Sequence, residues 1–426
     1  MTKLQDQFLE VGNYLGAKIC RDALWAGDRC NWLGPSMQNL GTSWGPVQTA
    51  YGPDLYSGTS GIALFLSHLY AATNEKIFRS VARGAINHCV SRAEDLPSNV
   101  HCGFYSGYTG IAHALIEASE QIEDESYVSK ALVLLQRLTK DESNDQGLDI
   151  ISGSAGAIPF LLEVHRRYPS DFLLALAISH GEHLLATVNK NSFGWSWNTL
   201  GSERNLTGFS HGAGGIGWAL LELHQQTEDD RFREAAEEAF RYERHYYNVE
   251  QENWPDFRTF VSQDSAASGA IPCGVAWCHG APGIGLSRLR AYQLTGDEQY
   301  RQEAEAALRT TTKMLTIGDH GRLNNFSLCH GITGNAELLI YASQVLGDKQ
   351  YDPLVNQIAE SGIEHYLKLN LPWPCGVPGA GESPNLMLGL AGIGYFYLRL
   401  SDAAKHRSVL MVVPGVRDRL DTFQCT

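Results

Sequence analysis

A short glycine pattern recurs seven times along this chain and constrains its fold more than any other feature. In each copy two glycines stand three positions apart, and an apolar stretch follows them. The copies are SGTSGIALFL at Ser57, SGYTGIAHAL at Ser106, SGSAGAIPFL at Ser152, HGAGGIGWAL at His211, HGAPGIGLSR at His279, HGITGNAELL at His330 and LGLAGIGYFY at Leu388. Successive copies are separated by 46 to 68 residues, so each repeat is long enough for two helices and their connections.

The residues after each motif predict two helices of different character. The segment 58–70 and its counterparts are apolar on most sides, which is typical of helices that are buried all round. A short polar turn follows, and after it the apolar residues lie on one face only, as in a helix with one buried side. In the first repeat this stripe is Ile77, Phe78, Val81, Ala82, Ala85, Ile86, Cys89 and Val90.

Seven such hairpins could stack as an open solenoid or close into a ring. We find no alternation of apolar and polar residues long enough for a central sheet, and an inner layer that is apolar all round favours closure. The sequence therefore predicts an all-α fold, an α/α toroid of seven helical hairpins. The glycines would lie at the start of the inner helices, where packing alone explains most of them. We expect a single domain over residues 1–426, with 1–50 as a leading segment and the repeats from about 51 to 400.

Composition narrows the function classes. Lys and Arg number 33 against 47 Asp and Glu, a net charge of −14, and no basic stripe or nucleic-acid motif is present, so we expect no nucleic-acid partner. Nine irregularly spaced cysteines in a chain of this size favour a reducing compartment, with some thiols used for metal binding or catalysis. The first residues lack the apolar segment of a signal peptide. No apolar run approaches the roughly 18–20 residues that span a bilayer. We therefore expect a soluble, cytoplasmic protein without a membrane span.

The residue before the first glycine points to a metal site. In three consecutive repeats it is histidine, namely His211, His279 and His330. In a toroid this position faces the same end of the pore in each repeat, so the three imidazoles would converge. The last two histidines follow Cys278 and Cys329. Two Cys-His-Gly sequences in equivalent register indicate a transition-metal site.

Thiolate and imidazole ligands favour zinc, with iron and copper as the alternative ions. A fourth, open position could take water or an incoming thiol, and a bound thiol loses its proton near neutral pH. The alternative is a closed structural site that uses both cysteines and both neighbouring histidines. Adjacent Cys and His side chains do not easily reach one ion together, which favours three ligands. Spacing alone leaves open which histidine binds.

Three further residues are candidates for the same cavity. His211 could act as a general acid or base at the pore mouth, or could simply bond backbone or solvent at a helix start. Asp149 lies four residues before Gly153 and could point into the cavity or cap the following turn. Trp277, next to Cys278, could be a pocket wall or part of the core.

These motifs carry a resemblance to a known family. WCHGAPGIG from Trp277 and CHGITG from Cys329 resemble the two zinc motifs of the lanthionine synthetase C-like family, and the seven repeats resemble its α/α toroid. RCNWLG from Arg29 resembles the start of the cyclase domains in two-function class II lanthipeptide synthetases. The chain is too short to include their dehydratase domain as well.

The resemblance implies a zinc ion held by Cys278, Cys329 and His330. It also implies that peptide cysteines add to dehydroalanine or dehydrobutyrine, which forms lanthionine or methyllanthionine thioether rings. His211 and Asp149 match the family's further active-site histidine and its pocket aspartate. The partner would be a dehydrated precursor peptide, supplied in this scheme by a separate dehydratase.

The sequence departs from the family pattern at one position, and the resemblance leaves the proton donor undecided between two histidines. The family's arginine, four residues before the first zinc cysteine, would fall at Gly274. Either His211 or His279, which stands where some members carry tyrosine, could protonate the enolate formed by thiol addition.

An α/α toroid with a zinc site is also compatible with two other function classes. Another α/α-toroid enzyme would be zinc prenyltransferase-like or would process glycosides, and the latter needs paired carboxylates where the motif positions here hold Ser and His. The non-enzyme alternative is a zinc-dependent protein that binds glutathione or a thiol peptide.

Overall fold

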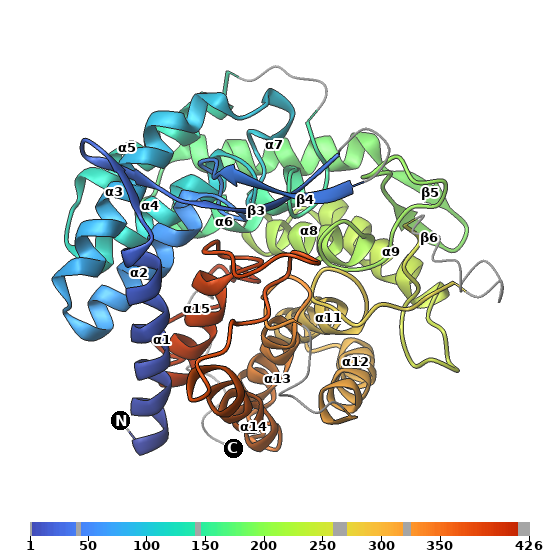
Figure 1. Cartoon of the computed structure of the whole chain (residues 1–426). Helices are drawn as coiled ribbons and strands as arrows, with labels where there is room; N and C mark the ends of the chain where they lie inside the picture. Colours follow the sequence, from blue (N-terminus) through green and yellow to red (C-terminus); the bar gives the residue numbers. More distant parts are fainter. Residues whose placement is uncertain (1, 40–43, 141–145, 259–270, 318–324, 416–426) are drawn as a thin grey trace, which may run out of the picture.

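The computed structural model describes residues 2–39, 44–140, 146–258, 271–317 and 325–415. Two concentric layers of helices form an α/α toroid (Figure 1), which confirms the predicted fold class. The inner helices are α2 (Thr59–Thr73), α4 (Tyr108–Ile122), α6 (Ser154–Arg167), α8 (Ala213–Thr227), α11 (Ala281–Thr295), α13 (Ile332–Leu346) and α15 (Leu390–Ser401). Each begins at the residue after the first glycine of its motif, so the motif marks every inner-helix start.

Six outer helices follow their inner partners along the chain. They are α3 (Lys76–Arg92), α5 (Ser126–Leu138), α7 (Asp171–Thr187), α9 (Asp230–His245), α12 (Glu298–Ile317) and α14 (Asp352–Gly362). The N-terminal helix α1 (Lys3–Arg21) takes the seventh outer position, because it packs against α15, and α15 in turn packs against α2 (Figure 1). Helices α1 and α15 thus close the toroid.

Strands in the described residues form only three antiparallel hairpins. The first two lie between α1 and α2, and the third lies between α7 and α8. The hairpins are β1 (Leu24–Ala26) with β2 (Arg29–Asn31), β3 (Leu33–Asn39) with β4 (Trp44–Ala50), and β5 (Asn189–Asn191) with β6 (Gly194–Ser196). Two short 3-10 turns, η1 (Ala93–Asp95) and η2 (Ser98–Val100), lead from α3 toward α4, and a π turn, η3 (Ile363–Leu367), follows α14.

The predicted apolar stripe of α3 is largely confirmed. Phe78, Val81 and Cys89 are fully buried. The prediction was wrong at Ile77, whose side chain is 52% exposed, because it lies in the first helical turn beside the exposed connection from α2. Burial of α3 thus follows its sequence period except in its first turn.

The inner layer also carries charge, which its apolar character did not indicate. Arg290 on α11 binds Glu222 on α8 at 2.5 Å, and Arg399 on α15 binds Glu337 on α13 at 2.6 Å. Both pairs are almost completely buried. Because an unpartnered buried charge is costly, each pair fixes the packing of adjacent inner helices.

The loops before the inner helices are joined in a closed circle of backbone hydrogen bonds. In each loop a backbone N–H donates to a carbonyl of a neighbouring loop, and the seventh loop returns to the first. The bonds run from Tyr56 to Tyr105 (2.9 Å), Tyr105 to Ile151 (3.0 Å), Ile150 to Ser210 (3.0 Å), Ser210 to Cys278 (3.1 Å), Cys278 to Cys329 (3.3 Å), Cys329 to Met387 (3.0 Å) and Met387 to Tyr56 (2.9 Å). This circle places residues of equivalent register side by side at one end of the toroid.

The second glycine of each motif lets these loops lie directly on the helices. A Cβ at Gly283 would lie 2.0 Å from the Trp277 carbonyl oxygen, and one at Gly334 would lie 1.7 Å from the Leu328 carbonyl oxygen. No side chain fits at such a separation. Packing therefore explains these glycines, as predicted, and it positions the loops that carry the two candidate cysteines.

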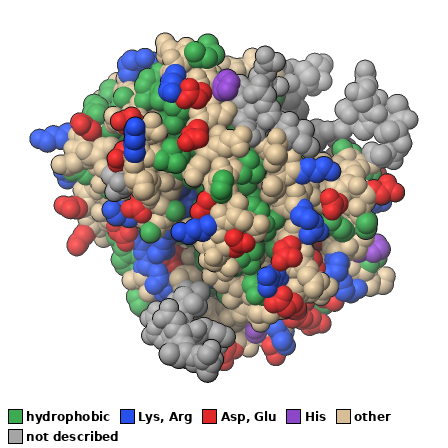
Figure 2. Space-filling view, turned by 90° about the horizontal axis from the view of Figure 1, so that it is seen from below, with side chains coloured by type: hydrophobic (Ala, Val, Ile, Leu, Met, Phe, Trp, Pro, Cys, Tyr) green, Lys and Arg blue, Asp and Glu red, His purple; other side chains and the backbone are tan. Residues whose placement is uncertain are grey.

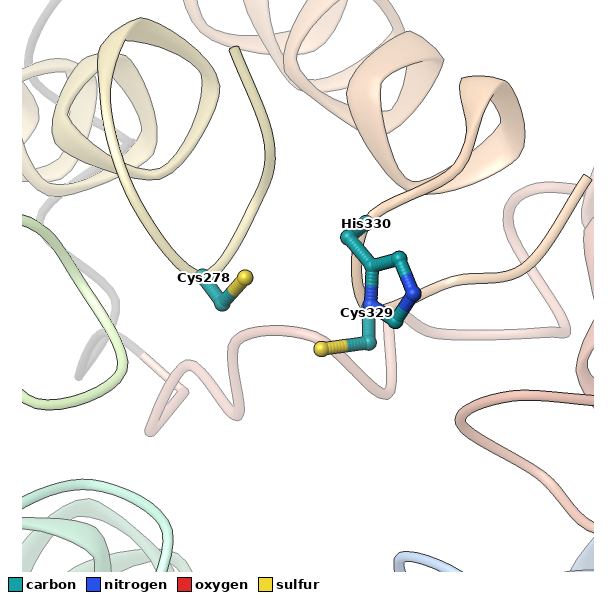
Figure 3. A group of neighbouring side chains, drawn as sticks. All are labelled: Cys278, Cys329 and His330. Atoms are coloured by element: carbon teal, nitrogen blue, oxygen red, sulfur yellow. The ribbon is translucent and has the colours of Figure 1, made fainter. Parts of the chain in front are cut away.

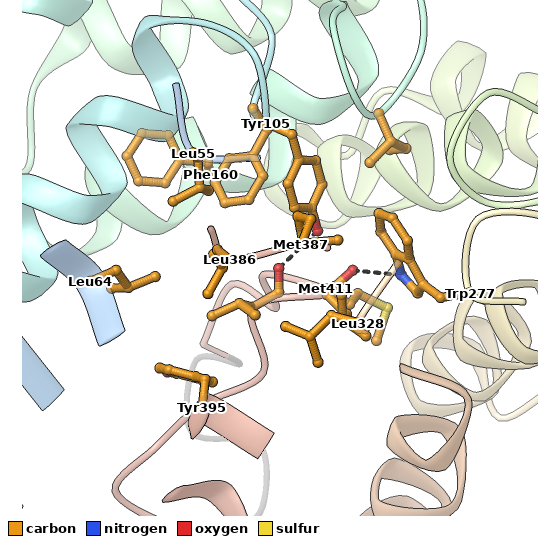
Figure 4. Close-up of a cluster of buried hydrophobic side chains, with 14 of the residues drawn as sticks. Leu55, Leu64, Tyr105, Phe160, Trp277, Leu328, Leu386, Met387, Tyr395 and Met411 are labelled. Atoms are coloured by element: carbon orange, nitrogen blue, oxygen red, sulfur yellow. Dashed lines mark hydrogen bonds between the residues drawn. The ribbon is translucent and has the colours of Figure 1, made fainter. Parts of the chain in front are cut away.

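The segment after α15 runs into the centre of the toroid and contacts the loops before the inner helices. The Tyr105 hydroxyl donates to the Val409 carbonyl at 2.8 Å, and the Trp277 indole N–H donates to the Leu410 carbonyl at 3.1 Å (Figure 4). Val409, Leu410 and Met411 are buried. Val409 and Met411 line a separate cavity among the inner helices and do not line the cavity at the mouth of the toroid.

A buried histidine between the two layers predicts acid sensitivity. His180 on α7 lies 3.1 Å from the Ser154 hydroxyl of α6, and burial lowers its pKa to about 4. Its unfolded pKa is about 6.5, so the neutral form favours the fold. This stabilisation is present above pH 6.5 and is lost as the pH falls toward 4. The free energy of unfolding then decreases by about 3 kcal/mol.

We expect His180→Gln to reduce this loss in urea unfolding measured from pH 7.5 to 4.5. Parallel pH profiles for the two proteins would show that His180 does not contribute.

The described surface gives two further observations. No helix in this part of the chain combines the length and apolar character needed to cross a membrane. On the face seen in Figure 2, acidic and basic side chains are interspersed. The net negative charge is thus not gathered into one acidic surface on this face.

Candidate metal centre

Cys278, Cys329 and His330 meet at the mouth of the toroid. Cys278 lies in the loop before α11, and the other two lie in the loop before α13. One ligand atom from each residue can be chosen so that all three lie within 4.8 Å of one another. Figure 3 shows both sulfur atoms pointing into the space between the two loops. A backbone hydrogen bond from the Cys278 N–H to the Cys329 carbonyl holds the two loops in this arrangement.

The imidazole of His330 is oriented by the backbone. Its Nε2 lies 2.9 Å from the Gly376 carbonyl oxygen. Because a carbonyl only accepts, Nε2 carries the proton and Nδ1 keeps the lone pair. Desolvation lowers the pKa of His330, so the ring is neutral at physiological pH. A neutral imidazole with its second N–H bonded to protein is the usual form of a metal ligand.

The two thiols shift each other's pKa in opposite directions. The pKa of Cys278 is lowered, first because the Cys329 thiol donates a hydrogen bond to it and also because the Arg258 guanidinium is near. The pKa of Cys329 is raised by the same hydrogen bond and by burial. Burial is the main cause that raises the pKa of cysteines elsewhere in the described chain, to about 12 in Cys20, Cys30, Cys89 and Cys375. The site therefore stabilises the thiolate form of Cys278 relative to that of the other buried cysteines.

These donors fit a divalent metal ion. Two sulfur atoms and one neutral nitrogen form a three-ligand set, which suits zinc and matches catalytic sites that keep one position open. His279 is not part of the group in the described structure, so the closed site that uses both histidines is not formed.

The three residues line one wall of a cavity of about 590 Å³. Tyr56, His211 and Arg258 line it as well. The cavity thus combines a candidate metal centre with an imidazole, a phenol and a guanidinium, which suffices for proton transfer and for stabilising negative charge.

His211 and Asp149 form a pair at the cavity wall. His211 Nδ1 lies 2.5 Å from Asp149 Oδ2, and Asp149 is buried. The other Asp149 carboxylate oxygen accepts the Ser152 backbone N–H at 2.7 Å. Asp149 therefore caps its turn, one of its two predicted placements, and orients His211 at the same time. It does not itself line the cavity. With Nδ1 bonded to Asp149, Nε2 is the His211 nitrogen left for a substrate.

The structure does not bring His279 and Trp277 to the cavity surface. His279 is 2% exposed, and its Nδ1 lies 3.9 Å from Asp256 Oδ1. Burial, followed by the nearby Arg258 charge, lowers the pKa of His279 to about 3. Trp277 is fully buried below the loops, where its ring contacts Tyr105. Of the candidate residues, His211 is thus the histidine available as a proton donor in the cavity.

Two cavity residues were missed from the sequence. The Tyr56 hydroxyl hydrogen-bonds with the Cys329 sulfur. Tyr56 occupies the register position of Cys278 and Cys329, two residues before the first glycine, and this signal could have identified it. The Arg258 guanidinium forms an ion pair with the Asp256 carboxylate, with Nη2 and Oδ2 2.6 Å apart. It comes from the longest interval between motifs, where the repeat gives no register.

Comparison with known proteins places this geometry in a family. Residues 49–412 match the family described as lanthionine synthetase C-like protein. The chain belongs to the lanthionine synthetase C-like family. The match includes every motif and every residue of the candidate centre, and it agrees with the resemblance seen in the sequence.

The relatives found for this lanthionine synthetase C-like chain are distant. The nisin biosynthesis protein NisC of Lactococcus lactis subsp. lactis is 21% identical over 345 residues, which cover 73% of this chain and 79% of NisC. The lacticin 481/lactococcin biosynthesis protein LcnDR2 of the same organism is 24% identical over 380 residues. That alignment covers 84% of this chain but 37% of LcnDR2. The structure of nisin cyclase superimposes with a TM-score of 0.63 at 19% identity, covering 83% of this chain and 89% of the cyclase, which shows the shared fold.

Proposed function

We propose that this protein is a zinc-dependent peptide cyclase. It would join cysteine thiols to dehydroalanine or dehydrobutyrine residues of a dehydrated precursor peptide, forming thioether rings. The observation that carries the proposal is the convergence of two sulfurs and an imidazole nitrogen on a cavity that also presents His211. The family relation to proteins of nisin and lacticin biosynthesis supports it.

Cys278, Cys329 and His330 would hold the zinc ion. When bound, zinc would lower the pKa of a coordinated substrate thiol so that it is a thiolate at neutral pH. The three ligands leave one position for that thiol. Tyr56 and the Gly376 carbonyl, each bonded to a ligand side chain, would keep the ligands in orientation.

His211 would move the proton in the reaction. The substrate sulfur forms a bond to the β-carbon, the carbon–carbon π pair shifts toward the carbonyl, and an enolate results. The α-carbon then takes a proton, which balances the proton lost by the thiol. His211 Nε2 can accept the thiol proton and return it to the α-carbon, while Asp149 stabilises the imidazolium and fixes its orientation.

Arg258 would stabilise the charge that develops on the enolate oxygen. Its guanidinium lies in the same cavity and is oriented by Asp256. A fixed positive group near a developing oxyanion favours the transition state over the ground state. Gly274, where the family resemblance placed an arginine, has no side chain, so Arg258 would supply the cation from a different segment.

The test uses a synthetic peptide with one cysteine and one dehydroalanine three residues apart. Cyclisation leaves its mass unchanged but removes the thiol, so iodoacetamide labelling followed by mass spectrometry reports ring formation. We expect loss of labelling to require both the protein and about one equivalent of zinc. A rate equal to that of the peptide alone would contradict the proposal. Saturable peptide binding without product would favour the alternative, a thiol-binding protein.

A further inference from the structure

One wall of the metal cavity is apolar, and neither metal binding nor the proposed proton transfer involves it. Leu96, Pro97, Val100 and Ile151 line the same cavity as the candidate metal centre. Pro97 is exposed and the other three side chains are half-buried, so their apolar groups face open space. Burial of such groups against a ligand is favourable. The wall therefore offers a binding surface to an apolar group of the substrate.

The apolar wall lies across the cavity from the candidate metal centre. In the circle of backbone hydrogen bonds, the loops of Cys278 and Cys329 are neighbours. The loop of Tyr105 is separated from this pair by two loops on either side. The segment 96–100 leads into the Tyr105 loop, and Ile151 belongs to the next loop of the circle. The metal centre and the apolar wall therefore face each other.

The segment that carries most of this wall is fixed by contacts with its surroundings. His101 Nε2 lies 3.0 Å from the Leu96 carbonyl oxygen, and the imidazole stacks on the Tyr108 ring with centroids 4.3 Å apart. The Gly147 N–H, from the loop before α6, donates to the Asn99 carbonyl at 3.2 Å. Because a preformed surface loses little conformational entropy on binding, the wall can contribute to both affinity and selectivity.

The position of the wall determines which part of a peptide reaches it. In the proposed reaction the β-carbon of the dehydro residue lies beside the substrate thiolate, on the metal side of the cavity. Consecutive residues of a peptide are about 3.8 Å apart, so the residue next to the dehydro residue is the first that can extend toward the opposite wall. A thiol and a methylene group fill only part of a cavity of about 590 Å³, which leaves room for the side chain of that residue.

We propose that Leu96, Pro97, Val100 and Ile151 select peptides in which an apolar side chain adjoins the dehydro residue. The inference rests on the proposed function, because it takes the substrate to be a dehydrated peptide. It adds the class of peptide and the residues that determine specificity. The wall would increase kcat/KM for such peptides. It would not affect zinc content, since none of its residues is among the three grouped ligands.

Two peptides that differ at one position test this preference. Each has one cysteine and one dehydroalanine. The residue next to the dehydroalanine is leucine in one peptide and asparagine, which has a similar shape, in the other. The pair is made with the variable residue on either side of the dehydroalanine. On one side we expect kcat/KM to be at least about tenfold higher for the leucine peptide, because that side chain is buried against the wall.

Two results with these peptides would overturn the assignment. One is equal kcat/KM for leucine and asparagine on both sides of the dehydroalanine. The other is a gain from dehydrobutyrine in place of dehydroalanine without any effect of the neighbouring residue, which would assign the wall to the methyl group instead.

Substitutions in the wall separate a contact from a structural effect. Val100→Asn should lower the leucine-to-asparagine ratio of kcat/KM at least about threefold, with zinc content unchanged. Ile151→Thr, in a different loop, should also lower the ratio, and thermal unfolding shows that each variant is folded. The matched control is Val133→Asn on α5, where Val133 is 52% exposed and does not line the metal cavity. This control should keep the wild-type ratio, and an unchanged ratio in both wall variants would contradict the proposal.

Peptide binding distinguishes failure of this inference from failure of the proposed function. Fluorescein-labelled peptides that keep the cysteine but carry alanine for dehydroalanine cannot cyclise, and fluorescence anisotropy reports their affinity for the zinc-loaded protein. Tighter binding of the leucine probe than of the asparagine probe, reduced in Val100→Asn, supports the wall even if no ring forms. If both reactive peptides cyclise while neither turnover nor binding distinguishes leucine from asparagine, the proposed function stands and the wall assignment is wrong.

Discussion

Replacement of Cys329 by alanine is expected to abolish tight zinc binding and to slow ring formation at least about 10³-fold, or ~4 kcal/mol in the barrier. The reason is that Cys329 would supply one of the two sulfur ligands of the grouped set. Its sulfur is hydrogen-bonded to Cys278, and its neighbour His330 supplies the nitrogen. Zinc content after dialysis and the thiol-labelling assay measure the two effects.

The matched control is Cys375→Ala. Cys375 is also a largely buried thiol, but burial raises its pKa to about 12 and it lies outside the candidate centre. This variant should keep one equivalent of zinc and near wild-type turnover. If Cys329→Ala kept both, Cys329 would not be a ligand and the metal centre would have to be placed elsewhere.

The second large effect is expected at His211. His211→Gln should lower turnover of the cysteine–dehydroalanine peptide by about 10²–10⁴-fold, because the cavity loses its proton-transfer group. Zinc content should remain at one equivalent, since His211 is not among the three grouped ligands. The readouts are turnover at saturating peptide and metal analysis of the same sample.

His279→Gln distinguishes the two histidines that the sequence left as candidates. His279 is buried and does not line the cavity, so its replacement should change turnover of the folded protein by a few-fold at most. Thermal unfolding of the variant controls for loss of structure. A larger effect of His279→Gln than of His211→Gln, with both proteins folded, would reverse the assignment of the proton donor.

The sequence predicts those parts of the fold in which the backbone packs so closely against nearby residues of the chain that only glycine fits. A glycine that must pack against a preceding carbonyl, as Gly283 does at Trp277, marks each inner helix independently of the rest of the chain. Seven such marks predict seven inner helices and place Cys278 and Cys329 in equivalent loops. The meeting of those loops follows from closure of the toroid, which the apolar inner layer favours.

Other features depend on contacts between distant segments, and the sequence pattern did not show them. The closing role of α1 follows from packing against α15 at the other end of the chain, and nothing in the repeat assigns a partner to either. Arg258 reaches the cavity from an interval without a motif. The repeat does not predict whether the His279 side chain faces the cavity. His279 and His330 occupy the same position in their motifs, and only the side chains that surround them decide which of the two lines the cavity.

The central claim is that two sulfurs and one imidazole hold zinc while one position stays open to a thiol. X-ray absorption at the zinc edge tests it most directly, on the loaded protein with and without a cysteine peptide. The account predicts two sulfur neighbours at about 2.3 Å and one imidazole nitrogen at about 2.0–2.1 Å, together with one further light atom that a third sulfur replaces when the peptide is added. A spectrum with four protein ligands that the peptide leaves unchanged would contradict it.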